Sequence, residues 1–148
     1  MINGADFVSQ LPVFTNDKHG LSQSAVHVSN QSTTFTAPAG VYLHGTFTIT
    51  VWFKAYSTGN WPRVFDFGNT ISNNGRNAFY IAAFASASDR TPRYFYTDSS
   101  GTHHGTISTN NIALNTWYFV AVTQTGTHVK LYLNNSLVSE KTNMIVLP

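Results

Sequence analysis

Short apolar runs separated by turn-forming residues constrain the fold of this chain more than any other feature of its sequence. The runs are roughly 5–9 residues long, and clusters of Asn, Ser, Gly and Pro recur between them. A turn signal about every 8–12 residues is typical of antiparallel sandwiches and barrels. No segment has a convincing helical period in its apolar residues. The spacing therefore predicts an all-β protein, built as an antiparallel sandwich or barrel.

Two of the runs give the clearest strand predictions. In residues 46–53, large apolar side chains alternate with threonines until Trp52 breaks the pattern. A period of two predicts a strand with one buried face. Residues 116–123 are apolar on both faces, which predicts a central strand covered on both sides. We expect Trp52 and Trp117, which lie in these two runs, to pack in the core.

The C-terminal third predicts two successive hairpins. Residues 127–133 alternate again and follow the previous run after the short connection Thr125-Gly126. Asn134-Asn135 then predicts a tight turn into a strand at 136–141, because Asn tolerates positive φ. Further strands are predicted at residues 24–29, 33–36, 63–67, 79–85, 93–97 and 105–108.

The amino-acid composition restricts the possible functions of the chain more than its possible folds. The 148 residues suit one domain, and only 9% of them are charged, with a formal net charge of +2. The polar surface must come from neutral residues, since the chain has 19 Thr, 14 Ser and 14 Asn. This balance gives no basic patch for nucleic acid. No apolar run reaches the roughly 18–20 residues of a membrane span, and no cysteine is present for disulfides or thiolate metal sites.

Five segments, taken in order, resemble the strands and turns of one family. They are Phe14-Thr15-Asn16-Asp17-Lys18-His19-Gly20 with the strand that follows, then residues 46–54, 63–69, 115–123 and 130–135. Together they resemble the concanavalin A-like lectin/glucanase superfamily, and within it the laminin-G-like domains. The resemblance spans about residues 14 to 140 and implies a jelly-roll sandwich.

The resemblance implies extracellular or cell-surface recognition without catalysis. Such modules bind glycans, or matrix and cell-surface proteins, through the loops at one end of the sandwich or through the concave sheet. Glycosidases that share the fold resemble one another in a Glu-x-Asp-x-Glu strand. Nothing similar occurs here, and Glu140 is the only glutamate. The first residues also lack a basic-then-apolar secretory signal, so the expected location rests on the resemblance.

The chain departs from the family pattern at its C-terminus. Related domains continue for some tens of residues and close with a strand that pairs back near the N-terminus, whereas residues 144–148 end this sequence. We therefore expect residues 1–148 to form a single laminin-G-like domain without that closing strand. An exposed sheet edge recruits partners. The alternative function is thus a structural subunit of a self-assembling extracellular filament or adhesive, in which residues 144–147 or 5–14 supply a strand to another copy of the chain.

Loop residues supply the candidates for ligand binding. Trp61 lies in a loop, where an indole ring offers a flat apolar face to a sugar ring, or else anchors the loop on the sandwich. Side chains that can hydrogen-bond to hydroxyl or carboxylate groups cluster in the neighbouring loops. The full set of ligand-binding candidates is Trp61, Asn73, Asn74, Arg76, Arg90, His103 and His104.

Calcium is the one cofactor considered, because the fold often holds it and its ligands are carboxylate, amide and carbonyl oxygens. The candidate ligands are Asp17, Asp66 and Asp98, although the turn around Asp17 explains that residue equally well. His103 and His104 are adjacent, so in an extended segment they face opposite ways and are poorly placed to share a zinc ion.

Overall fold

The computed structural model describes residues 6–7, 13–28, 35–36, 43, 45–68 and 78–145. The chain forms two compact units, Met1–Tyr42 and Leu43–Pro148. In the first unit, two short antiparallel pairs are present: β1 (Asp6–Phe7) with β4 (Phe35–Thr36), and β2 (Val13–Thr15) with β3 (Ala25–His27).

The turn between β2 and β3 is organised by Asp17. Its carboxylate accepts hydrogen bonds from the backbone N–H groups of His19 at 2.8 Å and Leu21 at 3.0 Å. Gly20, with φ of 82°, supplies the left-handed residue that such a turn needs. Burial opposes ionisation, but these backbone donors outweigh it and hold the pKa of Asp17 below its usual value. The predicted turn is therefore present, and its aspartate is occupied by the turn itself.

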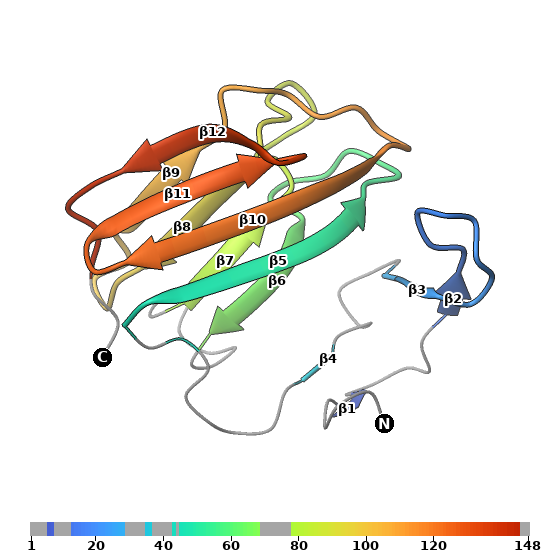
Figure 1. Ribbon diagram of the computed structural model, residues 1–148, viewed down its shortest axis with the longest axis horizontal. Coiled ribbons are helices and arrows are strands. Elements are labelled where there is room, and N and C mark those ends of the chain that lie inside the picture. The colour runs from blue at the N-terminus through green and yellow to red at the C-terminus, as the bar shows by residue number, and fades with distance from the viewer. Residues whose placement is uncertain are drawn as a thin grey trace. The chain divides into compact units, whose positions relative to one another are not determined.

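The second unit is a sandwich of two four-stranded antiparallel sheets, stacked as Figure 1 shows. The first sheet has the order β12-β11-β10-β5 and contains β5 (Phe47–Lys54), β10 (Trp117–Thr125), β11 (His128–Leu133) and β12 (Ser136–Lys141). The second has the order β6-β7-β8-β9 and contains β6 (Arg63–Gly68), β7 (Ala78–Ala82), β8 (Arg93–Thr97) and β9 (His103–Ile107). The residues that the structure describes include no helix. The all-β, two-sheet prediction is confirmed.

Side chains that alternate along the strands fill the space between the sheets. Val120 and Val122 of β10 are fully buried, and they pack with Ile81 of β7 and Leu131 of β11. Phe47, Val51 and Phe53 of β5 pack against the same cluster. Because successive strand residues point to opposite faces, this burial fixes which residues of each strand must face outward.

A polar chain of hydrogen bonds crosses the core. Gln124 of β10 is 1% exposed, and its Oε1 accepts a hydrogen bond from the Tyr94 hydroxyl of β8 at 3.3 Å. Its Nε2 donates to the backbone carbonyls of Gly126 at 3.2 Å and Ile145 at 2.8 Å. Burial raises the pKa of Tyr94 well above its usual range, so the hydroxyl stays a neutral donor. One glutamine thus joins both sheets to the C-terminal segment.

The two sheets also meet along one side, where β9 lies beside β12. The Thr106 and Ser139 hydroxyls share a hydrogen bond there, and the Thr109 N–H donates to the Val138 carbonyl at 3.3 Å. Hydrogen bonds therefore connect the two sheets along this side of the sandwich.

The hairpin predictions hold with small shifts. Asn134 and Asn135 both have positive φ, 48° and 68°, as the tight turn requires. The previous turn lies at Gly126-Thr127, one residue later than predicted, because β10 stays paired as far as Thr125. Strand β7 ends at Ala82 and not at residue 85, because the Ala83 N–H bonds to the Pro62 carbonyl instead of a neighbouring strand.

The placement of Trp52 corrects the expectation that it packs in the core. Its side chain belongs to the outward set on β5, is 44% exposed, and lies 5.2 Å from the ring of Phe119 on β10. The alternation that buries Phe53 forces its neighbour outward. Trp117 is half-buried and lies outside the core cluster, with the Lys54 ammonium 5.1 Å from its ring centroid.

We expect Tyr94→Phe to destabilise the protein although the ring still fills its place. Without the hydroxyl, Gln124 Oε1 is buried without a donor, which costs about 1–3 kcal/mol. Tyr96→Phe on the same strand is the matched control, because no described residue bonds to the Tyr96 hydroxyl, and it should change the free energy of unfolding by less than about 0.5 kcal/mol. Urea unfolding measures both. Equal effects in the two variants would contradict the role given to Gln124.

Candidate functional site

The outer face of the sheet β6-β7-β8-β9 carries a cluster of aromatic and charged side chains. Tyr80 of β7 and Phe95 of β8 are directly paired in the sheet, and both point away from the core. Their ring centroids are 5.8 Å apart. Trp61, from the loop before β6, and His103 of β9 pack against these two rings. Two sequence-predicted candidates, Trp61 and His103, are therefore brought together.

Backbone hydrogen bonds fix the loop that carries Trp61. The Trp61 N–H donates to the Ala85 carbonyl at 3.1 Å, and the Ala83 N–H donates to the Pro62 carbonyl at 2.9 Å. Trp61 has φ of 52°, a left-handed conformation that costs energy in a bulky residue. Its side chain is nevertheless 39% exposed. The loop holds this indole in a defined place, partly packed on the sheet and partly open to solvent.

The Trp61 and His103 rings lie nearly parallel. Their planes differ by 14° and their centroids are 6.4 Å apart. Both rings meet Tyr80 edge-on, at 83° for Trp61 and 84° for His103. Edge-to-face contacts of this kind stabilise aromatic clusters by about 0.5–1.5 kcal/mol per pair. Tyr80 therefore supports two parallel rings that rise from different elements.

Hydroxyl groups fix the imidazole of His103. Its Nδ1 is 3.0 Å from the Tyr80 hydroxyl and 3.0 Å from Thr97 Oγ1. No described residue bonds to Nε2, so this nitrogen is the one that remains for a ligand. Gly105, the alternate neighbour of His103, makes room for the Phe95 ring: a Cβ at this glycine would lie 2.5 Å from Phe95 Cδ1 and 2.0 Å from the Tyr94 carbonyl oxygen.

Two arginines lie against these rings. The Arg63 guanidinium carbon is 3.4 Å from the Tyr80 centroid and 6.0 Å from that of Trp61. The Arg93 guanidinium carbon is 5.0 Å from the Trp61 centroid. Cation–π contacts stabilise each pair, more strongly where the groups are shielded from water.

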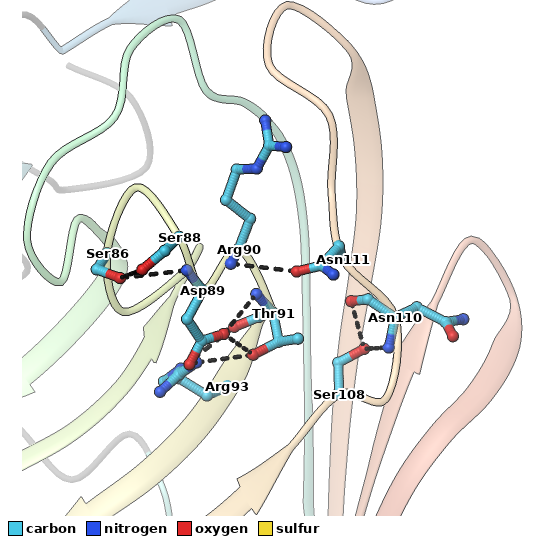
Figure 2. A network of polar contacts seen from close by, with 9 residues as sticks. All are labelled: Ser86, Ser88, Asp89, Arg90, Thr91, Arg93, Ser108, Asn110 and Asn111. Carbon is cyan, nitrogen blue, oxygen red and sulfur yellow. Dashed lines mark hydrogen bonds and ion pairs between the residues drawn. The ribbon is translucent and has the colours of Figure 1, made fainter.

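A hydrogen-bonded network fixes the Arg93 side chain, as Figure 2 shows. Its Nη2 donates to Asp89 Oδ2 at 2.8 Å and to Thr91 Oγ1 at 2.7 Å, while its Nε donates to the Thr91 carbonyl. Only 5% of the Arg93 side chain is exposed. Hydrogen bonds from Thr91 and Arg93 lower the pKa of Asp89 to about 2. The pair is therefore charged at all ordinary pH values, and the guanidinium is held in one place.

The network extends to neighbouring loops but leaves Arg90 outside it. Ser86 Oγ accepts from the Asp89 N–H at 3.2 Å, and Asn111 Oδ1 accepts from the Arg90 N–H at 3.2 Å. Figure 2 shows the Arg90 side chain extending away from the network. Of this predicted candidate, only the backbone takes part in the network.

His104 lies on the opposite face of β9 from His103, as expected for adjacent strand residues. Its ring stacks on Tyr96 at 6.2 Å, and its Nε2 is 2.9 Å from Asp98 Oδ2. Asp98 also accepts from Ser100 and Thr102 across the β8–β9 turn. Bonds from Ser100 and His104 hold the pKa of Asp98 well below its usual range. His104 therefore serves the turn and is no part of the aromatic cluster.

The calcium candidates each have other partners. Asp17 and Asp98 bind their own turns, and Asp66 pairs with Arg63, with Asp66 Oδ2 3.3 Å from Arg63 Nε. Burial raises the pKa of Asp66, and the Arg63 charge opposes that shift. Among the described residues, no three His, Asp or Glu side chains are grouped to hold a metal ion.

Three predicted candidates, Asn73, Asn74 and Arg76, lie outside the described residues. Several residues of the cluster were not predicted from sequence: Arg63, Tyr80, Arg93, Phe95 and Thr97. The only sequence signal for them was that the strands around residues 79–85 and 93–97 have aromatic residues on both faces. Such a pattern leaves aromatic rings on a solvent face whichever side is buried.

The comparison with protein families agrees with this architecture. A family model described as the concanavalin A-like lectin/glucanases superfamily, Laminin_G_3, matches residues 28–148. A search of curated proteins finds no match. Among solved structures, an S-layer domain-containing protein from Clostridium thermocellum ATCC 27405 is 25% identical, with a TM-score of 0.41. The match covers 97% of this chain and 62% of that one. No helix among the described residues is long and apolar enough to cross a membrane.

The Asp89–Arg93 pair predicts a specific pH dependence. The pKa of Asp89 is lowered on folding, so its contribution to stability is present above the unfolded value of about 4 and is lost as pH falls toward about 2. The Tm difference between the wild type and Asp89→Asn should therefore be largest near pH 7 and shrink across that window. Asp66→Asn is the control, because a raised pKa predicts that ionised Asp66 lowers stability. A Tm difference for Asp89→Asn that does not change with pH would contradict the assignment.

Proposed function

The chain belongs to the concanavalin A-like lectin/glucanase superfamily, and from this we propose that it is a non-catalytic extracellular recognition module that binds carbohydrate. The proposed binding surface is the aromatic cluster on the outer face of the sheet β6-β7-β8-β9. We define this surface, the Trp61 face, by Trp61, Arg63, Asp66 and His103; the Tyr80 ring, which is only 1% exposed, lies buried against them.

The observation that carries the proposal is a partly exposed indole held in a fixed place. Sugar rings present an apolar face of C–H groups that packs on an aromatic plane, and polar groups around the plane then read the hydroxyls. Trp61 supplies the plane, and His103 Nε2 lies on the ring nearly parallel to it. The Arg93 network fixes the indole before ligand arrives, which lowers the entropic cost of binding.

The arrangement of carboxylates supports binding without bond cleavage. Glycoside hydrolysis uses a pair of carboxyl groups, one of which must be protonated to act as the acid. Next to the Trp61 face, the pKa of Asp89 is about 2 and its carboxylate is bonded to Arg93. On the face itself, the Asp66 carboxylate is paired with Arg63. Glu140 lies on β12, in the other sheet, where it is 3.2 Å from His128 Nε2.

The extracellular location and the choice of glycan over a matrix or cell-surface protein are parts of the same proposal. Family membership supports the location. The combination of a partly exposed indole with hydrogen-bonding groups whose charges are paired supports a hydroxyl-rich ligand. The mechanism is reversible binding, and nucleic acid has no part in it.

A subunit of a self-assembling extracellular structure is the alternative. It requires a strand that one chain can give to the next. The start of residues 144–147 is occupied within its own chain: the Met144 N–H donates to the Thr127 carbonyl at 2.9 Å, and the Ile145 carbonyl accepts from Gln124. Residues 5–14 lie mostly outside the described residues. A clean monomer in size-exclusion chromatography with light scattering would contradict this alternative.

We expect Trp61→Ala to abolish most glycan binding. After a glycan array, run with and without calcium, identifies a ligand, calorimetry should show affinity at least about tenfold weaker for the variant, equivalent to about 1.4 kcal/mol. Trp52→Ala is the matched control, because this indole has similar exposure, 44% against 39%, on the other sheet. Its affinity should stay within about twofold of wild type. Absence of glycan binding by the wild type, or an equal loss in both variants, would overturn the proposal.

A further inference from the structure

Both arginines that lie against the aromatic cluster are paired with carboxylates. Arg63 Nε is 3.3 Å from Asp66 Oδ2, and Arg93 Nη2 is 2.8 Å from Asp89 Oδ2. The two cations and two anions cancel. The described part of the cluster therefore offers no unpaired positive charge to a ligand, despite its two guanidinium groups.

The two ion pairs differ in how far water reaches them. The Arg93 side chain is 5% exposed and already makes hydrogen bonds to Asp89 and Thr91, so it is committed to the fold. Arg63 and Asp66 are open, with side-chain exposures of 34% and 40%. The Arg63 guanidinium carbon also lies over the Tyr80 ring, 3.4 Å from its centroid, and this contact supports the guanidinium. The Arg63–Asp66 pair is thus the polar group that a ligand at the Trp61 face can touch.

An ion pair of this kind suits neighbouring hydroxyls. Arg63 uses Nε for Asp66 and keeps its two Nη groups as donors, while Asp66 keeps a second oxygen as an acceptor. A hydroxyl both donates and accepts, so two adjacent hydroxyls match one fixed donor and one fixed acceptor. A carboxylate or sulfate could use only the donors, and Asp66 would repel it.

From this geometry we infer that the Trp61 face is selective for neutral glycans, with the Arg63–Asp66 pair reading adjacent hydroxyls beside the aromatic rings. The inference rests on the proposed carbohydrate-binding function and names the class of ligand. Acidic glycans, such as uronates and sulfated polymers, are excluded because Asp66 holds the accessible arginine.

The test is affinity electrophoresis of the full chain at pH 8. The gels contain neutral polysaccharides (β-glucan, mannan and galactan) or acidic ones (polygalacturonate and heparin). The wild type should be retarded only by a neutral polymer. Raising the salt from about 0.1 to 0.5 M should change its affinity by less than about twofold, because no net charge is neutralised on binding.

Variants of the ion pair separate this inference from simple stacking on Trp61. Arg63→Gln should weaken binding to the neutral polymer by at least about fivefold. Asp66→Asn frees Arg63, so it should gain binding to polygalacturonate that disappears at high salt. Arg90→Gln is the matched control, since its side chain extends away from the network, and it should behave as wild type.

Each outcome supports or overturns the inference. If the wild type prefers an acidic polymer and Trp61→Ala abolishes that binding, the proposed function stands and neutral selectivity is wrong. If Asp66→Asn gains no binding to polygalacturonate while Arg63→Gln binds the neutral polymer as the wild type does, the ion pair does not contact the ligand and the inference is wrong. If no polymer retards the wild type, both the proposed function and this inference fail.

Discussion

The burial of one face of each central strand is the constraint on which the rest of the structure depends. Ile81 and Tyr94 pack against Val120 and Val122 between the sheets, and all four are fully buried. Since strand side chains alternate, this packing forces Tyr80 and Phe95 to the opposite face. The packing of the core therefore determines that the Tyr80 and Phe95 rings lie on the side of the sheet that carries the Trp61 face. A shift of one residue in the pairing of either strand would put its buried side chains on the outer face and its outer side chains in the core.

Polar contacts then fix the side chains that surround these two aromatic rings. Arg93 is fixed by Asp89 and Thr91, and His103 is fixed by two hydroxyls. Among the described residues, every buried polar side-chain atom has a hydrogen-bond partner. Buried polar groups that are fully satisfied hold one arrangement, because any other leaves a group without its partner. The exposed groups, Trp61 and the Arg63–Asp66 pair, are thus supported from beneath by groups with no freedom to move away.

The sequence predicted the fold well and the site only in part. Period-two patterns and the Asn134-Asn135 turn are local signals, and they located the strands of the sandwich to within a few residues. Trp52 was placed wrongly in the core. The alternation in residues 46–53 puts it on the threonine face, but that pattern was given less weight than the general tendency of large aromatic residues in strong strands to be buried. Trp61 and His103 were both named as candidates, but nothing in the sequence brings a loop at 61 next to a strand at 103. That proximity arises from sheet pairing. Arg63, Tyr80 and Arg93 were missed because strand residues read as structural until the buried face is known.

The most direct test of the account is to observe the three tryptophans separately during binding. In an ¹⁵N-labelled sample each of them gives one indole N–H signal, which mutation to phenylalanine assigns. On titration with a neutral oligosaccharide, the account predicts that the Trp61 signal shifts progressively and saturates while those of Trp52 and Trp117 stay in place. Movement of the Trp52 or Trp117 signal with a stationary Trp61 signal would show that the ligand binds elsewhere and would contradict the account.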